Sequence, residues 1–374
     1  MKILITGDLV VSNDYDPTRL IDKEVISMFR SSDYNIVNLE APVTSSQSKI
    51  NKTGPHLKSN NSSTKDVLSV LKIDLATLAN NHILDYNEQG VMETLAFCNE
   101  HNISTVGAGK DKTGAAKIHL IETPKGKLGV INIAENEWSS ATESTAGANG
   151  MSLIDDVYAI KETKKSCDFV VVIVHGGHEY YNLPSPRMQK QYRFYVDNGA
   201  DLVVGHHTHC ISGMETYKKK EIYYSLGNFL FTKPSGFEDW YTGIVLLVEI
   251  SEFKELKAKP IFVTQSKEDF SLTMIKGQEY DEIHKRFLEY SNTIRTESSL
   301  KESWLNYINK KQKQYESYWS PLSFIRNKYL KYALSKIGLY GRNTKTGRLL
   351  FLNLLRCEAH ADLSKEVLKA NLYK

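Results

Sequence analysis

The chain has 374 residues, of which 41% are hydrophobic and 24% charged, and its net charge is +3. These proportions are typical of a folded, water-soluble protein, and the length is sufficient for one large core and an additional segment. No run of about 18 apolar residues is present, which argues against a transmembrane helix. The apolar run that follows Met1-Lys2 is too short for a signal peptide, so we expect a cytoplasmic protein. The four cysteines are far apart and form no CxxC pair, which argues against a disulfide framework or a thiolate zinc site.

The first 250 residues alternate short apolar segments with amphipathic ones. The apolar segments are rich in Ile, Val and Leu and predict strands at residues 2–6, 35–39, 75–78, 128–133, 169–174 and 202–204. Between them, apolar residues recur at helical spacing and predict helices at residues 17–30, 87–101 and 186–198. This alternation predicts an α/β sheet with helices on both faces.

Further along, three predicted strands follow one another without intervening helices, at residues 221–226, 244–250 and 261–264. They favour an antiparallel extension or a second sheet, so we expect a two-sheet α/β sandwich. Two long polar segments, 44–63 and 138–150, are predicted to be loops. The first of these loops directly follows Glu40 and would be placed to cover a site there.

The last hundred residues differ in character from the rest. Helical patterns at residues 279–292, 299–317, 321–336 and 344–372 carry Trp and Tyr interleaved with Lys and Arg. Residues 285–374 hold 18 Lys and Arg against 7 Asp and Glu, a net charge of +11, whereas the remainder holds 29 against 37, a net charge of −8. We therefore predict two domains, a catalytic one at 1–275 and a basic, aromatic-rich helical extension at 276–374. The extension suits either peripheral contact with an anionic membrane or capsule machinery, or a cap that packs on the sandwich or on another subunit.

Side chains that bind metals follow the predicted strands at five places. They are Asp8, Glu40, Asn81 with His82 and Asp85, His175, and the histidines of Gly205-His206-His207-Thr208-His209. A buried carboxylate at a strand end needs a partner, and a cation is an efficient one. Carboxylates, an amide oxygen and imidazoles together suit one or two divalent metals.

The histidine-rich segment is the sharpest of these signals. Three imidazoles in four residues are costly to bury unless they are protonated or bound to a metal. In extended backbone, His207 and His209 would share a face and His206 would point away. We therefore expect His207 and His209 to be metal ligands, and His206 to lie behind them or to face the substrate.

Six motifs occur in a specific order along the chain. They are Gly-Asp at 7–8, Asn-Leu-Glu at 38–40, Ala-Asn-Asn-His-Ile-Leu-Asp-Tyr at 79–86, His-Gly-Gly-His-Glu-Tyr at 175–180, Gly-His-His-Thr-His at 205–209 and Ser-Leu-Gly-Asn-Phe at 225–229. This series resembles the CapA family of poly-γ-glutamate capsule biosynthesis proteins, which is similar to the calcineurin-like metallophosphoesterases. The resemblance covers about residues 1–250 and implies a metallophosphoesterase-like two-sheet α/β sandwich, which the helical extension would follow.

The resemblance also implies roles for individual residues. Asp8 would hold one metal, Glu40 would bridge two metals, and Asn81 would bind the second. The other implied metal ligands are His175, His207 and His209. His82, oriented by Asp85, would protonate the leaving group. Apart from the resemblance, the predicted catalytic residues are His82, Asp85 and His206.

Two positions depart from the metallophosphoesterase pattern. Val10 stands where a histidine ligand is usual, and Glu40 stands where the bridging acid is usually aspartate. One metal position thus loses a ligand, which favours a single divalent metal, or one tight and one loose site. The candidate ions are Mn, Fe, Zn, Ca and Mg.

The function expected from these features is that of a metal-dependent enzyme of capsule or peptide-polymer metabolism. It would hydrolyse a phosphoester, an amide or a peptide-like substrate, or abstract a proton as an epimerase does. The alternative is a non-catalytic assembly factor that binds an acidic polymer such as poly-γ-glutamate. Expected partners are acidic polymers, peptides or phosphorylated molecules and no nucleic acid, because no recognition motif accompanies the basic charge. An oligomer is compatible with the sequence.

Overall fold

The structure is a computed structural model, which describes residues 1–251, 255–319, 327–336 and 345–372. The chain divides into two compact units. The α/β unit comprises Met1–Ile50 and His56–Leu300, and the helical unit comprises Asn51–Pro55 and Lys301–Lys374.

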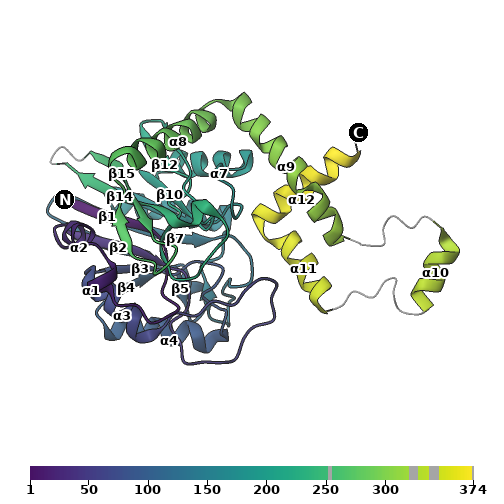
Figure 1. Ribbon diagram of the computed structural model, residues 1–374, viewed down its shortest axis with the longest axis horizontal. Helices are drawn as coiled ribbons and strands as arrows, with labels where there is room; N and C mark the ends of the chain where they lie inside the picture. The colour runs from purple at the N-terminus through teal and green to yellow at the C-terminus, as the bar shows by residue number, and fades with distance from the viewer. Residues whose placement is uncertain (252–254, 320–326, 337–344, 373–374) are drawn as a thin grey trace. The chain divides into compact units, whose positions relative to one another are not determined.

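Two large sheets form the centre of the α/β unit (Figure 1). The strands of the first are β1 (Lys2–Val10), β2 (Tyr34–Leu39), β3 (Leu75–Thr77), β4 (Ser104–Val106), β13 (Asn228–Phe231), β14 (Thr242–Ile250), β15 (Leu256–Gln265) and β16 (Leu272–Met274). Their order is β16-β15-β14-β1-β2-β3-β4, and β13 also pairs with β1. Strands β1 to β4 are parallel, whereas β14, β15 and β16 extend the sheet in antiparallel fashion.

The second sheet is also mostly parallel. Its strands are β6 (His119–Thr123), β7 (Gly126–Ala134), β9 (Phe169–His175), β10 (Leu202–His206), β11 (Met214–Tyr217) and β12 (Lys220–Tyr223), in the order β11-β12-β10-β9-β7-β6. Strands β7, β9, β10 and β12 run parallel to one another. A small separate pair joins β5 (Ala108–Gly109) to β8 (Gly147–Ala148), and β8 lies within the segment predicted to be a loop at 138–150.

Alternate side chains of each central strand enter different cores. Ile3 and Ile5 of β1 pack in one cluster with Val171 and Ile173 of β9, between the two sheets. Leu4 belongs to a second cluster outside the first sheet, and neighbouring residues of β9 belong to a third cluster outside the second. Because both faces of these strands are covered, they are apolar at nearly every position.

Helices cover the outer faces of both sheets. The helices of the α/β unit are α1 (Pro17–Leu20), α2 (Lys23–Arg30), α3 (Asn61–Val70), α4 (Asn87–Glu100), α5 (Lys112–Ala115), α6 (Leu153–Ser166), α7 (Pro186–Asp197) and α8 (Gly277–Arg295), with a 3-10 turn at Glu238–Tyr241. Apolar residues of α2, α3 and α4 pack on the first sheet, and those of α6 and α7 pack on the second. The predicted two-sheet α/β sandwich with a helical C-terminal segment is confirmed.

The predicted helix at 17–30 is wrong in one respect, because the structure divides it into α1 and α2. Ile21 forms a bridge with Leu272, and the Asp22 carboxylate accepts a hydrogen bond from the Glu24 amide, which caps α2. Helical periodicity alone does not detect this break, since Leu20 and Ile21 continue the apolar pattern.

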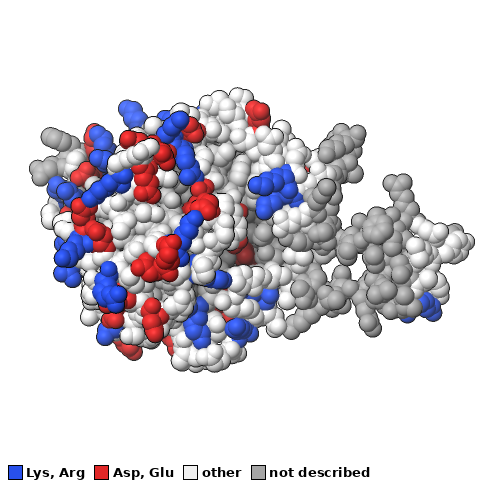
Figure 2. Space-filling model, viewed as in Figure 1, with Lys and Arg blue, Asp and Glu red and all other residues white. Residues whose placement is uncertain are grey.

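Charges of both signs are interspersed on the α/β unit. On the face of this unit drawn in Figure 2, Lys and Arg side chains lie beside Asp and Glu side chains. This mixed surface contrasts with the interior of the unit, where a few ionisable groups are collected at one place.

The helical unit contains most of α9 (Glu297–Trp319) together with α10 (Lys328–Lys336), α11 (Lys345–Arg356) and α12 (Glu358–Leu372). The predicted helix at 344–372 is thus two helices, and residues 321–326 of the predicted helix at 321–336 lie outside the described part of the chain. The Tyr315 hydroxyl lies 2.6 Å from His360 Nδ1, which joins α9 to α12. None of the helices in the described residues is long and apolar enough to cross a membrane.

Candidate metal centre

The residues predicted as metal ligands meet where the carboxyl ends of parallel strands from both sheets approach each other. The first sheet supplies Asp8 in β1, Glu40 after β2, and Asn81 and His82 after β3; the second supplies His175 at the end of β9 and His207 and His209 after β10. All of these side chains are buried. Ligand sites at this edge are a common property of α/β sheets, because the loops that follow parallel strands converge there.

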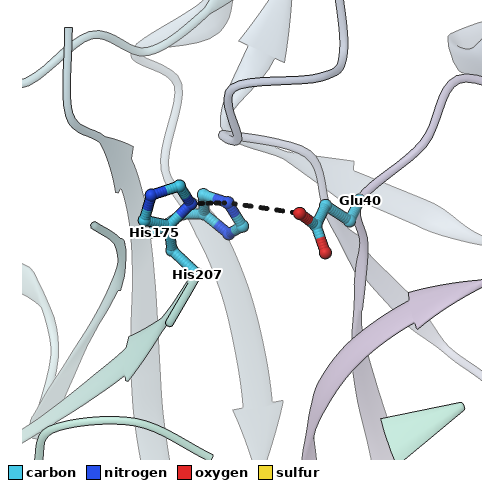
Figure 3. Close-up of side chains that lie close together, drawn as sticks. All are labelled: Glu40, His175 and His207. Carbon is cyan, nitrogen blue, oxygen red and sulfur yellow. Dashed lines mark hydrogen bonds and ion pairs between the residues drawn. The ribbon is translucent and has the colours of Figure 1, made fainter. Parts of the chain in front are cut away.

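A first ligand group consists of Glu40, His175 and His207, whose donor atoms lie within 4.8 Å of one another. His175 Nε2 is 3.8 Å from Glu40 Oε1 and 3.1 Å from His207 Nδ1. The carboxylate of Glu40 points toward the two imidazoles from the opposite side of the site (Figure 3). The amide oxygen of Asn81 lies 3.1 Å from the same His175 nitrogen. This group therefore offers four donor atoms from both sheets.

A second ligand group consists of Asp8, Glu40 and His209, again within 4.8 Å of one another. His209 Nε2 is 3.6 Å from Glu40 Oε1, and His209 Nδ1 is 3.6 Å from Asp8 Oδ2. Glu40 belongs to both groups, which is the arrangement expected of a carboxylate that bridges two ions.

Burial sets the protonation of these groups. It raises the pKa of Asp8 to about 7, although hydrogen bonds from Asn38 and from the His207 amide lower it. Burial also lowers the pKa of His209 to about 4 and that of His175 well below its ordinary value. These two imidazoles are therefore neutral at pH 7, as metal ligands must be, and a bound cation would compensate the buried carboxylates. The donor set present fits one or two divalent metal ions.

The direction of the Asp8 side chain follows from an irregularity in β1. The pairing of β1 with β2 shifts register between Ile5 and Asp8, and its pairing with β13 shifts between Asp8 and Leu9. Such bulges turn a side chain out of the regular alternation. Gly7 permits the close approach of the chain here, because a Cβ at this position would lie 2.0 Å from the Gly227 carbonyl oxygen.

His207 and His209 reach the site by a different route from the one predicted. Strand β10 ends at His206, and the backbone φ angles of His207 and His209 are +88° and +55°. The prediction that both share one face of an extended segment is wrong, because left-handed residues in a turn bring them together. Positive φ is uncommon for residues other than glycine and is often found at functional sites.

The Asn228 side chain fixes which nitrogen of His209 carries the proton of the neutral ring. Its Oδ1 lies 2.9 Å from His209 Nδ1, and its amide nitrogen donates to the Trp240 carbonyl oxygen at 3.0 Å. Because Asn228 Nδ2 is the donor to Trp240, its Oδ1 accepts the proton of His209 Nδ1. This leaves Nε2 of His209 available on the side of Glu40.

His82 and Asp85 form a buried pair beside the two ligand groups. His82 Nδ1 is 2.7 Å from Asp85 Oδ2, and His82 Nε2 is 4.0 Å from Glu40 Oε1. The same Asp85 oxygen accepts a hydrogen bond from the Leu57 amide at 2.7 Å. The pair thus places one imidazole nitrogen toward the carboxylate shared by both ligand groups.

The structure does not place His206 with the other predicted site residues. Its Nε2 lies 2.8 Å from the Thr6 carbonyl oxygen, and the side chain is 1% exposed. Burial lowers the pKa of His206 to about 4. Of the two positions expected for His206, behind the ligands or facing the substrate, the structure shows the first: this residue joins the ends of β1 and β10.

Val10 explains why the second ligand group has fewer donors than the first. This residue is 1% exposed and packs in an apolar cluster with Phe231 and Trp240. The rings of Phe231 and Trp240 contact the His209 ring at centroid distances of 5.4 and 4.7 Å. Apolar contacts therefore surround His209 on the side of Val10, the position where metallophosphoesterases usually have a further histidine ligand.

Two further side chains at the site were not predicted from the sequence. Asn38 lies between the carboxylate and imidazole groups, with Nδ2 at 2.6 Å from Asp8 Oδ1 and 3.1 Å from His175 Nδ1. Glu137 Oε1 lies 3.5 Å from His207 Nε2, on the other side of the ring from His175. Asn38 belongs to the Asn-Leu-Glu motif and could have been found there. Glu137 lies in a polar segment after β7 and carries no comparable sequence signal.

The segment after Glu40, predicted to be a covering loop at 44–63, is tied to the α/β unit at both ends. The Glu93 carboxylate accepts hydrogen bonds from the Thr44 hydroxyl at 2.6 Å and from the Ser45 amide at 2.7 Å. Further along, the Leu57 amide binds Asp85, which holds His82. Helix α3 begins at Asn61, so the last residues of the predicted loop are helical.

Comparison with known proteins gives the family. Residues 2–233, more than half of the chain, match the bacterial capsule synthesis protein family PGA_cap. The chain belongs to this family. The PGA biosynthesis protein CapA of Bacillus subtilis (strain 168) is 36% identical over 209 residues, which are 54% of this chain and 54% of that protein. The capsule biosynthesis protein CapA of Bacillus anthracis is 31% identical over 223 residues, which are 57% of this chain and 54% of that protein. The matched segment spans about half the length of these relatives.

Solved structures are similar at a lower level. A novel phosphatase from Mycoplasma pneumoniae has a TM-score of 0.45 and 15% sequence identity, with 71% of this chain and 93% of that chain covered. At this level the likeness contributes nothing to the choice of an activity, which rests on the site residues themselves. The resemblance to the CapA family stated from the motifs is confirmed by the family match.

Proposed function

We propose that this capsule-family protein is a metal-dependent enzyme that acts on a phosphoester, amide or peptide-like substrate in capsule or peptide-polymer metabolism. One observation supports this proposal above the others. Oε1 of Glu40 lies within 4.0 Å of a nitrogen of His175, of His209 and of His82. A single carboxylate thus belongs to both ligand groups and also lies near the imidazole of His82, which belongs to neither group.

The donor set also indicates the metals that the site would select. Three imidazoles accompany the carboxylates and the Asn81 amide. Imidazole suits Fe or Zn, and the carboxylate and amide oxygens suit Mn, whereas Ca and Mg prefer oxygen ligands throughout. The first ligand group offers four donors and the second three. We therefore propose one tight and one loose site for transition metals. When bound, such an ion polarises a carbonyl or phosphoryl oxygen and lowers the pKa of water.

The residues of the chain provide the proton transfer. Asp85 accepts the proton of His82 Nδ1, so Nε2 of His82 faces Glu40 and the substrate side. In this orientation His82 can carry a proton to a leaving group or remove one from a substrate. Asn38 holds the Asp8 carboxylate in place, and Asn228 holds His209.

The decisive experiment compares full-length protein with its His82→Ala variant on a panel of phosphoesters, amides and glutamyl peptides, with Mn²⁺ supplied. We expect turnover of at least one class, and a loss of about 10²- to 10⁴-fold in the variant, because His82 supplies acid–base catalysis. His101→Ala is a matched control, since His101 packs against Phe97 away from the ligand groups. Absence of turnover across the panel, together with normal capsule function of the His82→Ala variant in cells, would reject an enzyme.

That outcome would favour the second candidate, a non-catalytic assembly factor that binds an acidic polymer. The observation that supports this candidate is that Val10, which packs in an apolar cluster, stands where a histidine ligand is usual. Calorimetry with poly-γ-glutamate would then show binding in wild-type protein that Asp8→Asn and His209→Ala reduce. The acidic polymer is the proposed partner in both cases, as substrate or as cargo.

We also propose a peripheral contact with anionic lipid through α10. Tyr329, Tyr332 and Lys336 follow one face of this helix, with the two tyrosines 73% and 64% exposed. Leu330 is also exposed, at 49%. Exposed tyrosine beside lysine is typical of helices that lie in the interface of a membrane.

A further inference from the structure

Tyr180 stands at the edge of the metal centre in a strained conformation. Its backbone φ is +61°, and its amide donates a hydrogen bond to the Thr208 carbonyl oxygen at 2.9 Å. The side chain is 43% exposed. A left-handed conformation is unfavourable for a bulky residue and persists where the surroundings impose it. Here the bond to Thr208, between His207 and His209, holds an exposed aromatic ring against the site.

Three aromatic rings in contact with one another connect the exposed surface with the second ligand group. The Tyr180 ring is edge-on to Phe237 at 5.1 Å and stacked on Trp240 at 6.4 Å with an interplanar angle of 26°. Trp240 in turn lies 4.7 Å from the His209 ring, and Tyr180 itself is 6.2 Å from it. The wall of the site on the side of the second ligand group is therefore aromatic and partly open to solvent.

Lys233 places a positive charge beside this wall. The residue is exposed and follows Phe231, whose ring contacts His209, and its carbonyl oxygen accepts a hydrogen bond from Trp240 Nε1 at 3.1 Å. This bond places the Lys233 backbone against the tryptophan on which Tyr180 stacks. Among the described residues, Lys233 forms none of the ion pairs that occupy other surface lysines. Its charge is thus available to a bound anion.

We infer that Tyr180, Phe237, Trp240 and Lys233 form a substrate subsite beside the second ligand group. It receives a flat group that carries a neighbouring oxyanion. The flat group packs on the Tyr180 ring, because planar groups stack favourably on aromatic faces. The oxyanion is paired by Lys233. An aryl or nucleoside phosphate and an acyl-amino-acid carboxylate share this chemistry. The inference rests on the proposed function only in placing the reacting bond at Glu40.

The test measures binding rather than turnover, so that it stays separate from the test of the activity. Full-length His82→Ala protein loaded with Mn²⁺ is titrated calorimetrically with two pairs of probes. The first pair is phenyl phosphate and methyl phosphate, and the second is hippurate and N-acetylglycine. In at least one pair the probe with the ring binds about fivefold to tenfold more tightly. The pair that shows the difference tells whether phosphate or carboxylate is preferred.

Two variants in the same background assign that difference to residues. Tyr180→Ala weakens the binding of only the probe with the ring, so the two members of the preferred pair then bind with similar affinity. Lys233→Met weakens both members of the pair alike. Tyr158→Ala and Lys161→Met are controls of the same type on α6, where both residues are exposed, and leave all affinities unchanged.

The subsite is rejected if Tyr180→Ala preserves the difference within each pair, or if none of the four probes binds the Mn²⁺-loaded protein. The proposed activity can fail independently. A protein that turns over no substrate, yet loses its preference for the aromatic probe in Tyr180→Ala, would have the subsite as a binding site without catalysis.

Discussion

The two compact units of the chain place their polar and apolar residues in opposite ways. The α/β unit buries carboxylates and imidazoles together at the ends of its strands, and its surface carries charges of both signs. In the helical unit, α10 instead exposes tyrosine and leucine beside lysine. Burying charge without compensation is unfavourable, so the first unit indicates a bound cation. Exposed aromatic residues beside basic ones indicate a surface that contacts something else. We therefore expect that substitutions in the α/β unit change metal binding without changing surface contacts, and that substitutions in α10 do the reverse.

The largest expected effect that separates the units is on metal content. Glu40→Ala should lower metal affinity by more than the 10- to 100-fold typical of losing an outer partner, because it removes a donor from both ligand groups. The measurement is metal content after dialysis, together with titration of Mn²⁺. Glu100→Ala on α4 is the control, since this residue is exposed. Lipid binding of the Glu40 variant should stay at the wild-type level. A variant that retains two equivalents of metal would contradict the shared role of Glu40.

A second effect concerns Glu137, which contacts the opposite side of a ligand imidazole. Glu137→Gln should lower Mn²⁺ affinity by about 10- to 100-fold, because the carboxylate orients His207 and favours its donor nitrogen. Glutamine preserves the size of the side chain but removes the charge. The ¹⁵N chemical shifts of the His207 ring should change in the metal-free variant, which a merely structural role would not produce. Unchanged affinity together with unchanged ring shifts would exclude a positioning role.

A third effect tests the helical unit alone. Replacing Tyr329, Leu330 and Tyr332 of α10 by serine should reduce binding to phosphatidylserine vesicles by about tenfold or more, because it removes the exposed apolar side chains. Metal content should not change. Flotation of the full-length protein measures the effect, with Tyr158→Ser as a control for the loss of an exposed tyrosine. Equal flotation of the variant and wild type, or no flotation of either, would leave α10 without a role at lipid surfaces.

The smallest expected effect is a difference in local acid sensitivity between helix α12, which carries His360, and helix α4, which carries Glu93. Burial lowers the pKa of His360 to about 4, so the unfolded state binds more protons than the folded state below about pH 6.5. The stability of the helical unit should therefore fall as the pH decreases from 6.5 to 4. Hydrogen bonds led by that from Thr44 lower the pKa of Glu93 to about 2, so its contribution is lost only below about pH 4.5.

Hydrogen exchange distinguishes these two windows. Opening free energies of α12 amides should decrease between pH 7 and pH 5, whereas those of α4, which carries Glu93, should hold until pH 4.5. The Glu93→Gln variant should lose the dependence below pH 4.5. Equal losses in both helices between pH 7 and pH 5 would show that a group other than His360 controls the acid response.

Much of the fold could be predicted because apolar runs mark covered strands directly. The apolar run at 169–174 corresponds to β9, which has one further residue. A strand that is buried on both faces is apolar at nearly every position, so the sequence shows it as an uninterrupted apolar run. Helix α6 was not predicted. Leu153, Ile154 and Tyr158 are exposed there, so its apolar residues do not form the inward stripe that periodicity detects. The division between α1 and α2 depends on a long-range bridge to Leu272, which local pattern cannot contain.

The candidate site shows the same limit at the level of single residues. Motif order placed the predicted metal ligands and His82 in one region, since strand ends of parallel sheets converge. The backbone turn that orients His207 and His209 could not be predicted, because non-glycine residues seldom take positive φ. Glu137 was missed for a related reason: its role depends on a contact with His207 across 70 residues of chain, and its own segment is a polar loop.

The position of Glu40 in both ligand groups has a thermodynamic consequence. When an ion in one group orients the Glu40 carboxylate, this side chain has already lost the conformational entropy that binding an ion in the other group would cost. Occupancy of the two groups is therefore linked. The factor by which an ion in the first group changes the affinity of the second group equals the factor by which an ion in the second group changes the affinity of the first. With four donors on one side and three on the other, the better-equipped group fills first and sets the affinity of its neighbour. The protein would then pass through a state with one ion bound before the second group fills, without any movement of the sheets.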